Sequence, residues 1–505
     1  MNTFRIIVVG VTLFFSSLGN TQSKQADYLE VIDALSLPDI RAAMLSSASH
    51  GLNYKSYWTD AMELSFQQGG NPLLKTQANE NFLNLLKDIS LGVVNPESMG
   101  VDVKLKQKVF LTAPQLKVLL LASGTSANPL MEGLAPKTAQ YITLKEALHK
   151  LISYCSQGQW PELPPLKKDL KPGVYSPAIP ALKERMRQLG YNIPSNDDIF
   201  DEDTVDAAID IQWMSRVKPD GVISANGRTF KYLNTPCETR IQQVRLDMEK
   251  LRWFPQTFED RYIFINLAMS QFTLIDKTGP SLFSMNFRTI NGRVARKSPT
   301  LKDKIVYVVI NPFWVVPPTI FKEDKVEEIR KLQPWEIAAY FQTRNYEVWN
   351  RDFTQRIDPT TIDWNAQDPN LDSEIFIRQK PNYMNALGVL KFMLTNSFAI
   401  YLHDTNQREI FSDPFRLISS GCVRLERPMD LAEYLLRGTP WTRELIERYA
   451  AKPGEVLDMD TRVALKKAMP VYMAFLTSQL SSDGVIRFAE DTYDQGSRLL
   501  KLGAW

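Results

Sequence analysis

The chain has 505 residues, of which 44% are hydrophobic and 23% are charged, and its formal net charge is +2. This length predicts about two to four domains with buried cores, and the nearly balanced charge excludes the strongly basic surface typical of nucleic-acid-binding proteins. The sequence also lacks a Cys/His cluster with zinc spacing, a Walker loop and a dinucleotide-binding fingerprint.

Residues 1–23 are predicted to be a secretory signal peptide. Arg5 supplies the positive charge, residues 6–18 the apolar run and Ser17-Leu18-Gly19 a small-residue cleavage site. The run is too short for a comfortable membrane span, and an uncleaved anchor is the alternative interpretation. No other segment is expected to cross a bilayer. We therefore expect the mature chain to be exported and soluble.

Export bears on the three cysteines, because disulfides form in oxidising compartments. A pair between Cys155 and Cys237 would leave Cys422 as the free thiol. This pairing is a hypothesis, and the alternative is that Cys155 and Cys237 are separate buried thiols.

Residues 24–164 are predicted to form a helical domain, since Tyr141, Leu144 and Leu148 recur at helical spacing. A proline-rich linker then leads into a second unit, residues 165–238. Ile179, Leu182, Met186 and Leu189 make one helical stripe there, Val205 to Trp213 a second, and Thr229–Leu233 a short third helix.

Residues 239–505 are predicted to be mostly β. Tyr262–Leu267 and Gln271–Asp276 suggest a hairpin, and Ile305–Ile310 suggests a buried strand. Residues 321–375 interrupt this pattern with helical and loop-like segments, and a stretch this long between strands is often functional.

A histidine and a cysteine with catalytic potential lie near the end of this region. The β-type run Ser397–Leu402 leads to His403, and Cys422 follows the small-residue turn Ser419-Ser420-Gly421. Pro428 can then open a helix over Met429–Leu436.

These residue types suit nucleophilic catalysis. An imidazole can take the proton of a thiol whose pKa is ordinarily about 8.5. Small residues before the cysteine let backbone N–H groups reach a developing oxyanion. The adjacent Arg424 is expected to favour the thiolate and can grip a carboxylate. A lone cysteine, however, is more often a small buried hydrophobe.

The strings Tyr401-Leu402-His403-Asp404-Thr405 and Ser419-Ser420-Gly421-Cys422-Val423-Arg424 resemble the L,D-transpeptidases that cross-link bacterial peptidoglycan, in particular their large multidomain Gram-negative branch. Ser420 stands where many relatives have His. Residues 141–161 are similar to the scaffold region of that branch. Residues 165–238 resemble a three-helix peptidoglycan-binding module, with Ile211 in place of the usual Phe and Ser224 in place of a frequent Gly.

The resemblance implies a multidomain α+β protein. Its parts would be a helical scaffold, the small three-helix module and a mostly β catalytic domain, with residues 321–375 as a capping insertion over the cleft. It also implies a periplasmic location, a role in cell-wall organisation and cell shape, and acylation of Cys422 by carbapenems. The expected partners are stem tetrapeptides and glycan strands, with no nucleic acid, and the chain is expected to be a monomer. Whether the module still binds glycan remains open.

The implied reaction is acyl transfer without a metal ion or organic cofactor. Cys422 would attack the third residue of a stem tetrapeptide, with His403 as general base. The resemblance places the carbonyl that orients His403 around Ser419 or Ser420. Tyr401 alternates with His403 on one strand face, so both can face the cleft. The other expected roles are oxyanion stabilisation by the backbone of Ser420, Gly421 and Cys422, and substrate binding by Ser419, Tyr401 and Arg424.

Several alternatives remain. Water as acceptor would give an L,D-carboxypeptidase or hydrolase, and a protein lysine would give protein attachment to the wall. A non-catalytic wall-binding scaffold is a further possibility. Arg424 can also pair with an acidic residue and merely hold the turn. A papain-like protease is disfavoured because His403 precedes Cys422.

Overall fold

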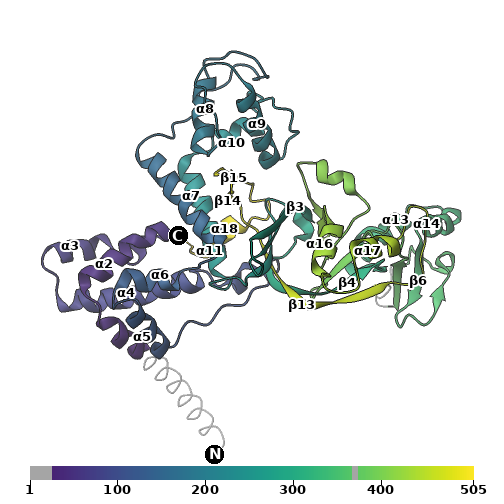
Figure 1. The fold of residues 1–505 in the computed structure, drawn as a ribbon, viewed down its shortest axis with the longest axis horizontal. Helices are drawn as coiled ribbons and strands as arrows, with labels where there is room; N and C mark the ends of the chain where they lie inside the picture. Colours follow the sequence, from purple (N-terminus) through teal and green to yellow (C-terminus); the bar gives the residue numbers. More distant parts are fainter. Residues whose placement is uncertain (1–24, 367–373, 505) are drawn as a thin grey trace, which may run out of the picture. The chain divides into compact units, whose positions relative to one another are not determined.

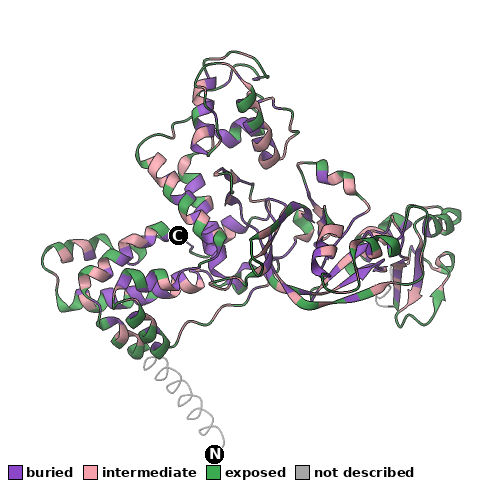
Figure 2. Ribbon diagram, viewed as in Figure 1, coloured by how far each residue is buried: buried purple, intermediate pink, exposed green. Residues whose placement is uncertain are grey.

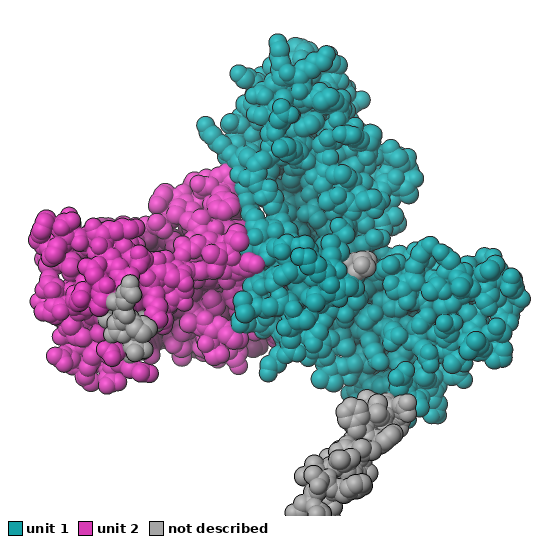
Figure 3. Space-filling view, turned by 180° about the vertical axis from the view of Figure 1, so that it is seen from behind, with its two compact units in different colours: residues 1–258, 475–505 teal, residues 259–474 magenta. Residues whose placement is uncertain are grey.

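The computed structural model of the chain describes residues 25–366 and 374–504. The predicted signal peptide lies outside these residues. No helix within the described ranges is long and apolar enough to cross a membrane. The chain divides into two compact units (Figure 3). Unit 1 combines the segment ending at Phe258 with Phe475–Trp505, and unit 2 is Glu259–Ala474. The predicted β region 239–505 is therefore wider than unit 2.

Unit 1 is mainly helical, as predicted for residues 24–238 (Figure 1). Local capping explains several boundaries: in α4, Pro72 occupies the first turn, and the Asn71 side chain accepts from the Leu74 N–H at 2.8 Å. The longer helices are α2 (Leu37–Ser46), α3 (Asp60–Gln67), α4 (Pro72–Leu91), α5 (Ala113–Ala122), α6 (Ala127–Leu134), α7 (Ala139–Ser156), α8 (Ile179–Gln188), α9 (Glu202–Ser215), α10 (Arg228–Leu233) and α11 (Cys237–Arg252).

The core of unit 1 lies where these helices face one another. Phe82, Leu86 and Leu148 are fully buried, and exposed residues follow the outer faces (Figure 2). The Cys155–Cys237 disulfide joins the end of α7 to the start of α11, as hypothesised. Cys422 is consequently the only free cysteine of the sequence.

The last residues of the chain complete unit 1. They form β14 (Ser478–Leu480), β15 (Ile486–Phe488) and α18 (Gln495–Lys501). Arg498 of α18 makes an ion pair with the buried Asp102 at 2.6 Å. The buried carboxylate of Asp247 in α11 accepts from the backbone N–H of Ser478 at 2.6 Å. These contacts add partners to two buried carboxylates, and Asp247 is also paired with Lys250 of its own helix at 2.9 Å.

Unit 2 is built on one large sheet with the order β11-β3-β12-β10-β9-β4-β13-β1-β2, in which β2 also pairs with β3. This extra pairing closes the strands from β3 to β2 into a barrel-like ring. The predicted hairpin is β1 with β2, and the predicted buried strand is β4. The bounds are β1 (Arg261–Asn266), β2 (Gln271–Asp276), β3 (Phe283–Gly292), β4 (Leu301–Ile310), β9 (Leu390–Leu394), β10 (Leu402–His403), β11 (Leu417–Ser419), β12 (Val423–Leu425) and β13 (Thr461–Ala474).

A second, smaller layer of unit 2 corresponds to the predicted capping insertion but begins earlier and ends later. Its sheet has the order β5-β8-β6-β7, with β5 (Trp314–Val315), β6 (Tyr346–Asn350), β7 (Arg356–Ile357) and β8 (Ile375–Gln379). The helical segments are α12 (Pro318–Ile320), η5 (Phe321–Val326), α13 (Glu327–Ile329) and α14 (Ile337–Thr343). We call residues 314–379 the cap.

The hydrophobic core of the cap continues onto the segment before β10 and onto the turn that carries Cys422. Trp314, Phe321 and Trp364 belong to one buried cluster that also contains Tyr401, and Cys422 packs against it. The cap is thereby anchored beside the predicted nucleophile. Two helices, α16 (Pro428–Leu435) and α17 (Arg443–Tyr449), follow β12, and α16 begins at Pro428 as predicted.

Candidate active site

His403 and the turn carrying Cys422 lie on neighbouring parallel strands. Leu402 pairs with Val423, and His403 pairs with Arg424. The predicted strand Ser397–Leu402 is wrong in extent, because β10 contains only Leu402 and His403. The preceding segment is a loop: the Asn396 side chain accepts from the N–H groups of residues 398 and 400, and Ala399 has a φ of +57°. Those N–H groups are therefore unavailable to a strand ladder.

A pocket of about 910 Å³ contains all the predicted site residues in its lining. One wall comes from the catalytic strands and the Cys422 turn, and the other comes from the cap helix, residues 318–331. The pocket is large enough for an extended peptide segment. The residues that sequence analysis selected are Tyr401, His403, Ser419, Ser420, Gly421, Cys422 and Arg424.

The His403 ring is buried and held in one tautomer. Its Nδ1 lies 2.5 Å from the carbonyl oxygen of Asp404, and because a carbonyl can only accept, Nδ1 carries the proton. The orienting carbonyl belongs to the next residue in the chain, so the expectation that it lay around Ser419 or Ser420 is wrong. In the neutral ring, Nε2 then has a lone pair that can accept a proton.

Burial, followed by the nearby Arg424, lowers the pKa of His403 to about 3. The ring is therefore neutral at physiological pH. Burial also raises the pKa of the Cys422 thiol, although Tyr401, Lys391 and Arg424 act in the opposite direction. The predicted effect of Arg424 on the thiol is thus present but is outweighed by desolvation. The unliganded site contains a neutral thiol and a neutral imidazole.

The Cys422 turn is held by hydrogen bonds of its own residues. The Ser419 hydroxyl donates to the Cys422 carbonyl at 2.6 Å and accepts from the Gly421 N–H at 3.2 Å. Gly421 has a φ of +113°, and its carbonyl accepts from Ser298 Oγ at 2.7 Å. Ser419 therefore shapes the turn in addition to lining the pocket. The Gly421 N–H must exchange its present partner before it can bind an oxyanion.

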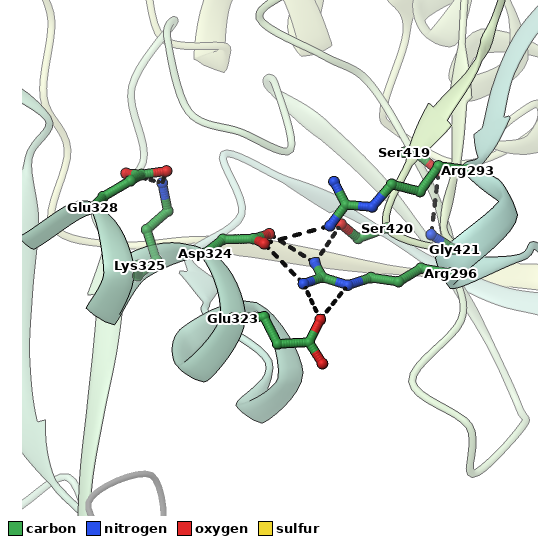
Figure 4. A network of polar contacts seen from close by, with 9 residues as sticks. All are labelled: Arg293, Arg296, Glu323, Asp324, Lys325, Glu328, Ser419, Ser420 and Gly421. Carbon is green, nitrogen blue, oxygen red and sulfur yellow. Dashed lines mark hydrogen bonds and ion pairs between the residues drawn. The ribbon is translucent and has the colours of Figure 1, made fainter. Parts of the chain in front are cut away.

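Sequence analysis missed Arg296, which links this turn to the cap, because its partner in the turn, Ser420, lies 124 positions further along the chain. Arg296 Nη1 donates to Ser420 Oγ at 3.1 Å and forms ion pairs with Asp324 at 2.7 Å and Glu323 at 2.5 Å (Figure 4). The Arg293 N–H donates to the Ser419 carbonyl at 2.9 Å. These contacts tie the cap helix to the nucleophile turn.

Arg424 projects into the pocket without an acidic partner. Its Nη1 donates to Gln407 at 2.6 Å, and no carboxylate of the described residues forms an ion pair with it. The alternative that Arg424 pairs with an acidic residue is therefore not what the described contacts support. Burial lowers its pKa, but an arginine side chain stays protonated in proteins, so the guanidinium is available to an anionic ligand group.

Asp404, the residue after His403, is held in place by hydrogen bonds and by its close contact with the backbone of Gly388. The Asp404 carboxylate accepts from the Val389 N–H at 2.9 Å and from Arg408 at 2.6 Å. Gly388, with a φ of +59°, lies so close that an added Cβ would be 2.2 Å from this carboxylate. The absence of a side chain at residue 388 thus allows Asp404 to present its carbonyl to His403.

We expect Gly388→Ala to lower the free energy of unfolding by about 2–4 kcal/mol and to reduce turnover, because the new methyl group must displace Asp404. Urea unfolding and steady-state kinetics measure the two effects. Gly454→Ala is the matched control: Gly454 has a φ of +87° but nothing within 4 Å of an added Cβ. Equal destabilisation by the two changes would show that only backbone strain matters.

Three family models match separate parts of the chain. Residues 260–442 match the L,D-transpeptidase catalytic domain, residues 36–148 match the scaffold domain, and residues 175–228 match a domain described as "Putative peptidoglycan binding domain". A Haemophilus influenzae protein described as "Putative L,D-transpeptidase" is 28% identical over 260 residues, which are 51% of this chain. The match covers 49% of that relative, so the chain spans about half of its length.

Two solved structures were also compared. An L,D-transpeptidase from Xylanimonas cellulosilytica is 12% identical with a TM-score of 0.19, covering 62% of this chain and all of that one. A fused Zn-dependent amidase/peptidase/peptidoglycan-binding domain-containing protein from Clostridium acetobutylicum is 10% identical with a TM-score of 0.16, covering 61% of this chain and 99% of that one. Both TM-scores are too low to bear on the site. The described residues contain no group of His, Cys, Asp or Glu suited to a metal ion.

Proposed function

We propose that this chain, which belongs to the L,D-transpeptidase family, cross-links peptidoglycan by joining the third residues of two stem peptides. The observation that supports this reaction best is that one free thiol, Cys422, on the turn before β12, and a neutral, oriented imidazole, His403, at the end of β10, line the same large pocket. This arrangement combines a nucleophile with a base that can accept its proton.

In the first half-reaction, His403 Nε2 accepts the proton of Cys422 as the sulfur attacks the carbonyl carbon of the third residue of a donor tetrapeptide. A C–S bond forms, and the carbonyl oxygen becomes an oxyanion. The backbone N–H of Cys422 is the first candidate donor to it, and the Gly421 N–H joins once it leaves Ser419 Oγ. The C–N bond then breaks, and the terminal D-alanine leaves with the proton from His403.

In the second half-reaction, the side-chain amine of a neighbouring stem attacks the thioester. His403 again accepts a proton, the new amide bond forms, and Cys422 is released as a thiol. Diaminopimelate is the acceptor residue that we propose for a Gram-negative wall. The low pKa of His403 fits both steps, since the ring returns to its neutral form as soon as the proton is passed on.

The pocket offers Arg424 as the site for a stem carboxylate, because its guanidinium lines the pocket and lacks an acidic partner among the described residues. Tyr401 is the proposed aromatic wall beside the nucleophile, with its ring centroid 5.7 Å from that of His403. We further propose that the chain acts in the periplasm and that residues 165–238 contact glycan strands.

The test is to incubate the purified mature chain, residues 24–505, with disaccharide-tetrapeptide and to analyse the products by mass spectrometry. Dimers joined through two third-position residues, together with released D-alanine, are the expected result. Tripeptide without dimers would instead identify an L,D-carboxypeptidase with the same nucleophile. Addition of a lysine-bearing protein acceptor tests attachment of proteins to the wall, and no product under any condition would contradict the proposal.

A further inference from the structure

The row of residues across the catalytic sheet contains a second cation, Lys391, that neither the sequence motif nor the proposed reaction uses. On β9, Lys391 pairs directly with His403 of β10, and on the other side His403 pairs directly with Arg424 of β12. Directly opposite residues on adjacent strands project from the same face of a sheet. The imidazole therefore lies between two cationic side chains.

Lys391 contacts the ring of Tyr401, which lies close to the proposed nucleophile. Its Nζ lies 3.9 Å from the centroid of the Tyr401 ring, well within the distance of about 6 Å at which cation–π contacts form. Tyr401 in turn packs in the same buried cluster as Cys422. Lys391 is half-buried, and among the described residues no carboxylate forms an ion pair with it. Its charge is thus not neutralised by an adjacent carboxylate.

We propose that Lys391 is an electrostatic positioning residue, which keeps His403 neutral and stabilises the Cys422 thiolate from beneath the Tyr401 ring. This inference rests on the proposed acyl transfer. When the thiol proton moves to His403, the sulfur becomes negative and is attracted to Lys391 and Arg424. The imidazolium is repelled by the same two cations, so the proton passes on readily to the leaving amine.

The effects of neighbouring groups on the pKa values of the site agree with this arrangement. Lys391 contributes to the lowering of the pKa of His403, after burial and Arg424, and it lowers the pKa of Cys422 against the larger opposing effect of burial. Burial lowers the pKa of Lys391 itself, and Cys422 opposes that change. The lysine and the thiol are therefore coupled.

Other titratable groups face Cys422 across the pocket. On the loop after β3 and on the cap helix, most of them are engaged with one another: Arg296 with Glu323 and Asp324, Arg293 with Asp324, and Lys325 with Glu328. Lys297, Glu327 and Lys331 also line the pocket. Two further charged groups act on Lys391: Asp460 raises its pKa, and Arg462 lowers it. None of these groups lies in the row of paired residues Lys391, His403 and Arg424. Substitution of Lys391 therefore changes the charge of that row alone.

The test measures the rate of Cys422 alkylation by iodoacetamide between pH 6 and pH 11, followed by intact mass. Cys422 is the only free thiol, so a single adduct reports on it. Lys391→Met keeps the length of the side chain and removes the charge, and we expect it to raise the apparent pKa of the thiol by about one pH unit. Lys391→Gln is expected to shift it in the same direction, and Lys391→Arg to leave the profile close to that of the parent protein.

Lys304→Met, at an exposed position on β4 of the same unit, is the matched control and is expected to leave the profile unchanged. The proposal is overturned if Lys391→Met and Lys391→Gln give the parent profile, or if Lys391→Arg shifts it as far as they do. Circular dichroism of each variant establishes that it is folded. Alkylation requires no peptidoglycan, so this result stands whether or not the product assay supports transpeptidation.

Discussion

Replacing Cys422 by alanine is expected to abolish cross-link formation, with a loss of at least about 10⁴-fold in rate, because the thioester can form on no other atom. The remaining cysteines, Cys155 and Cys237, are joined in a disulfide in unit 1 and cannot substitute for it. Intact-mass measurement after incubation with tetrapeptide should show an acyl adduct on the parent chain and none on Cys422→Ala.

The control for this result separates loss of the nucleophile from loss of the fold. Cys422→Ala removes one sulfur atom at the pocket wall, so the free energy of unfolding should change by no more than about 1 kcal/mol. The double change Cys155→Ser with Cys237→Ser should behave in the opposite way: stability falls by about 2–4 kcal/mol, while acylation of Cys422 persists at moderate temperature. Dimers made by folded Cys422→Ala would place the nucleophile elsewhere.

Replacing His403 by glutamine is expected to reduce kcat/KM by about 10²–10⁴-fold, since the amide can occupy the same space but is too weakly basic to accept the thiol proton. His50→Gln is the matched control. His50 is also buried, but it lies in unit 1, with its ring nitrogens 3.1 Å from the Tyr141 hydroxyl and 2.9 Å from Glu132. That change should leave the pocket and its turnover unaffected. Equal losses in the two variants would indicate a general effect on folding.

The pH dependence provides an independent check on His403. A general base must be unprotonated, and the pKa of His403 is lowered to about 3. The rate should therefore not fall as the pH decreases through 6.5, where an ordinary histidine gains its proton. An acid limb of kcat/KM centred near pH 6.5 in the parent enzyme, and absent from His403→Gln, would contradict this account of the site.

Much of the architecture could be predicted because local patterns determined it. The hairpin of β1 and β2 follows from two short apolar runs with a small-residue turn, and α16 follows from Pro428 and an amphipathic stretch. The strand before His403 was overestimated, because propensity does not reveal that the Asn396 side chain occupies the backbone N–H groups there. The assignment of residues 475–504 to unit 1 depends on long-range contacts, and no local sequence pattern predicts it.

The candidate residues could be named from the sequence, whereas their electrostatic state could not be predicted. The resemblance of the strings around His403 and Cys422 to the L,D-transpeptidases selected this pair, and its catalytic role stays a prediction. Burial decides that both groups are neutral, and burial is a property of the folded pocket. Arg296 and Lys391 were overlooked for the same reason, because only pairing across strands and the position of the cap bring them to the site.

The division of unit 1 into two separated stretches of chain has a consequence for the order of folding. Its helical part is synthesised first, but Asp102 and Asp247 receive some of their partners from residues 478–498, after all of unit 2 has been made. Unit 2 is continuous in sequence and can close as soon as residue 474 is available. The nascent chain is therefore expected to complete its catalytic unit before its helical one, because Asp102 and Asp247 gain part of their hydrogen bonding only from residues that follow unit 2.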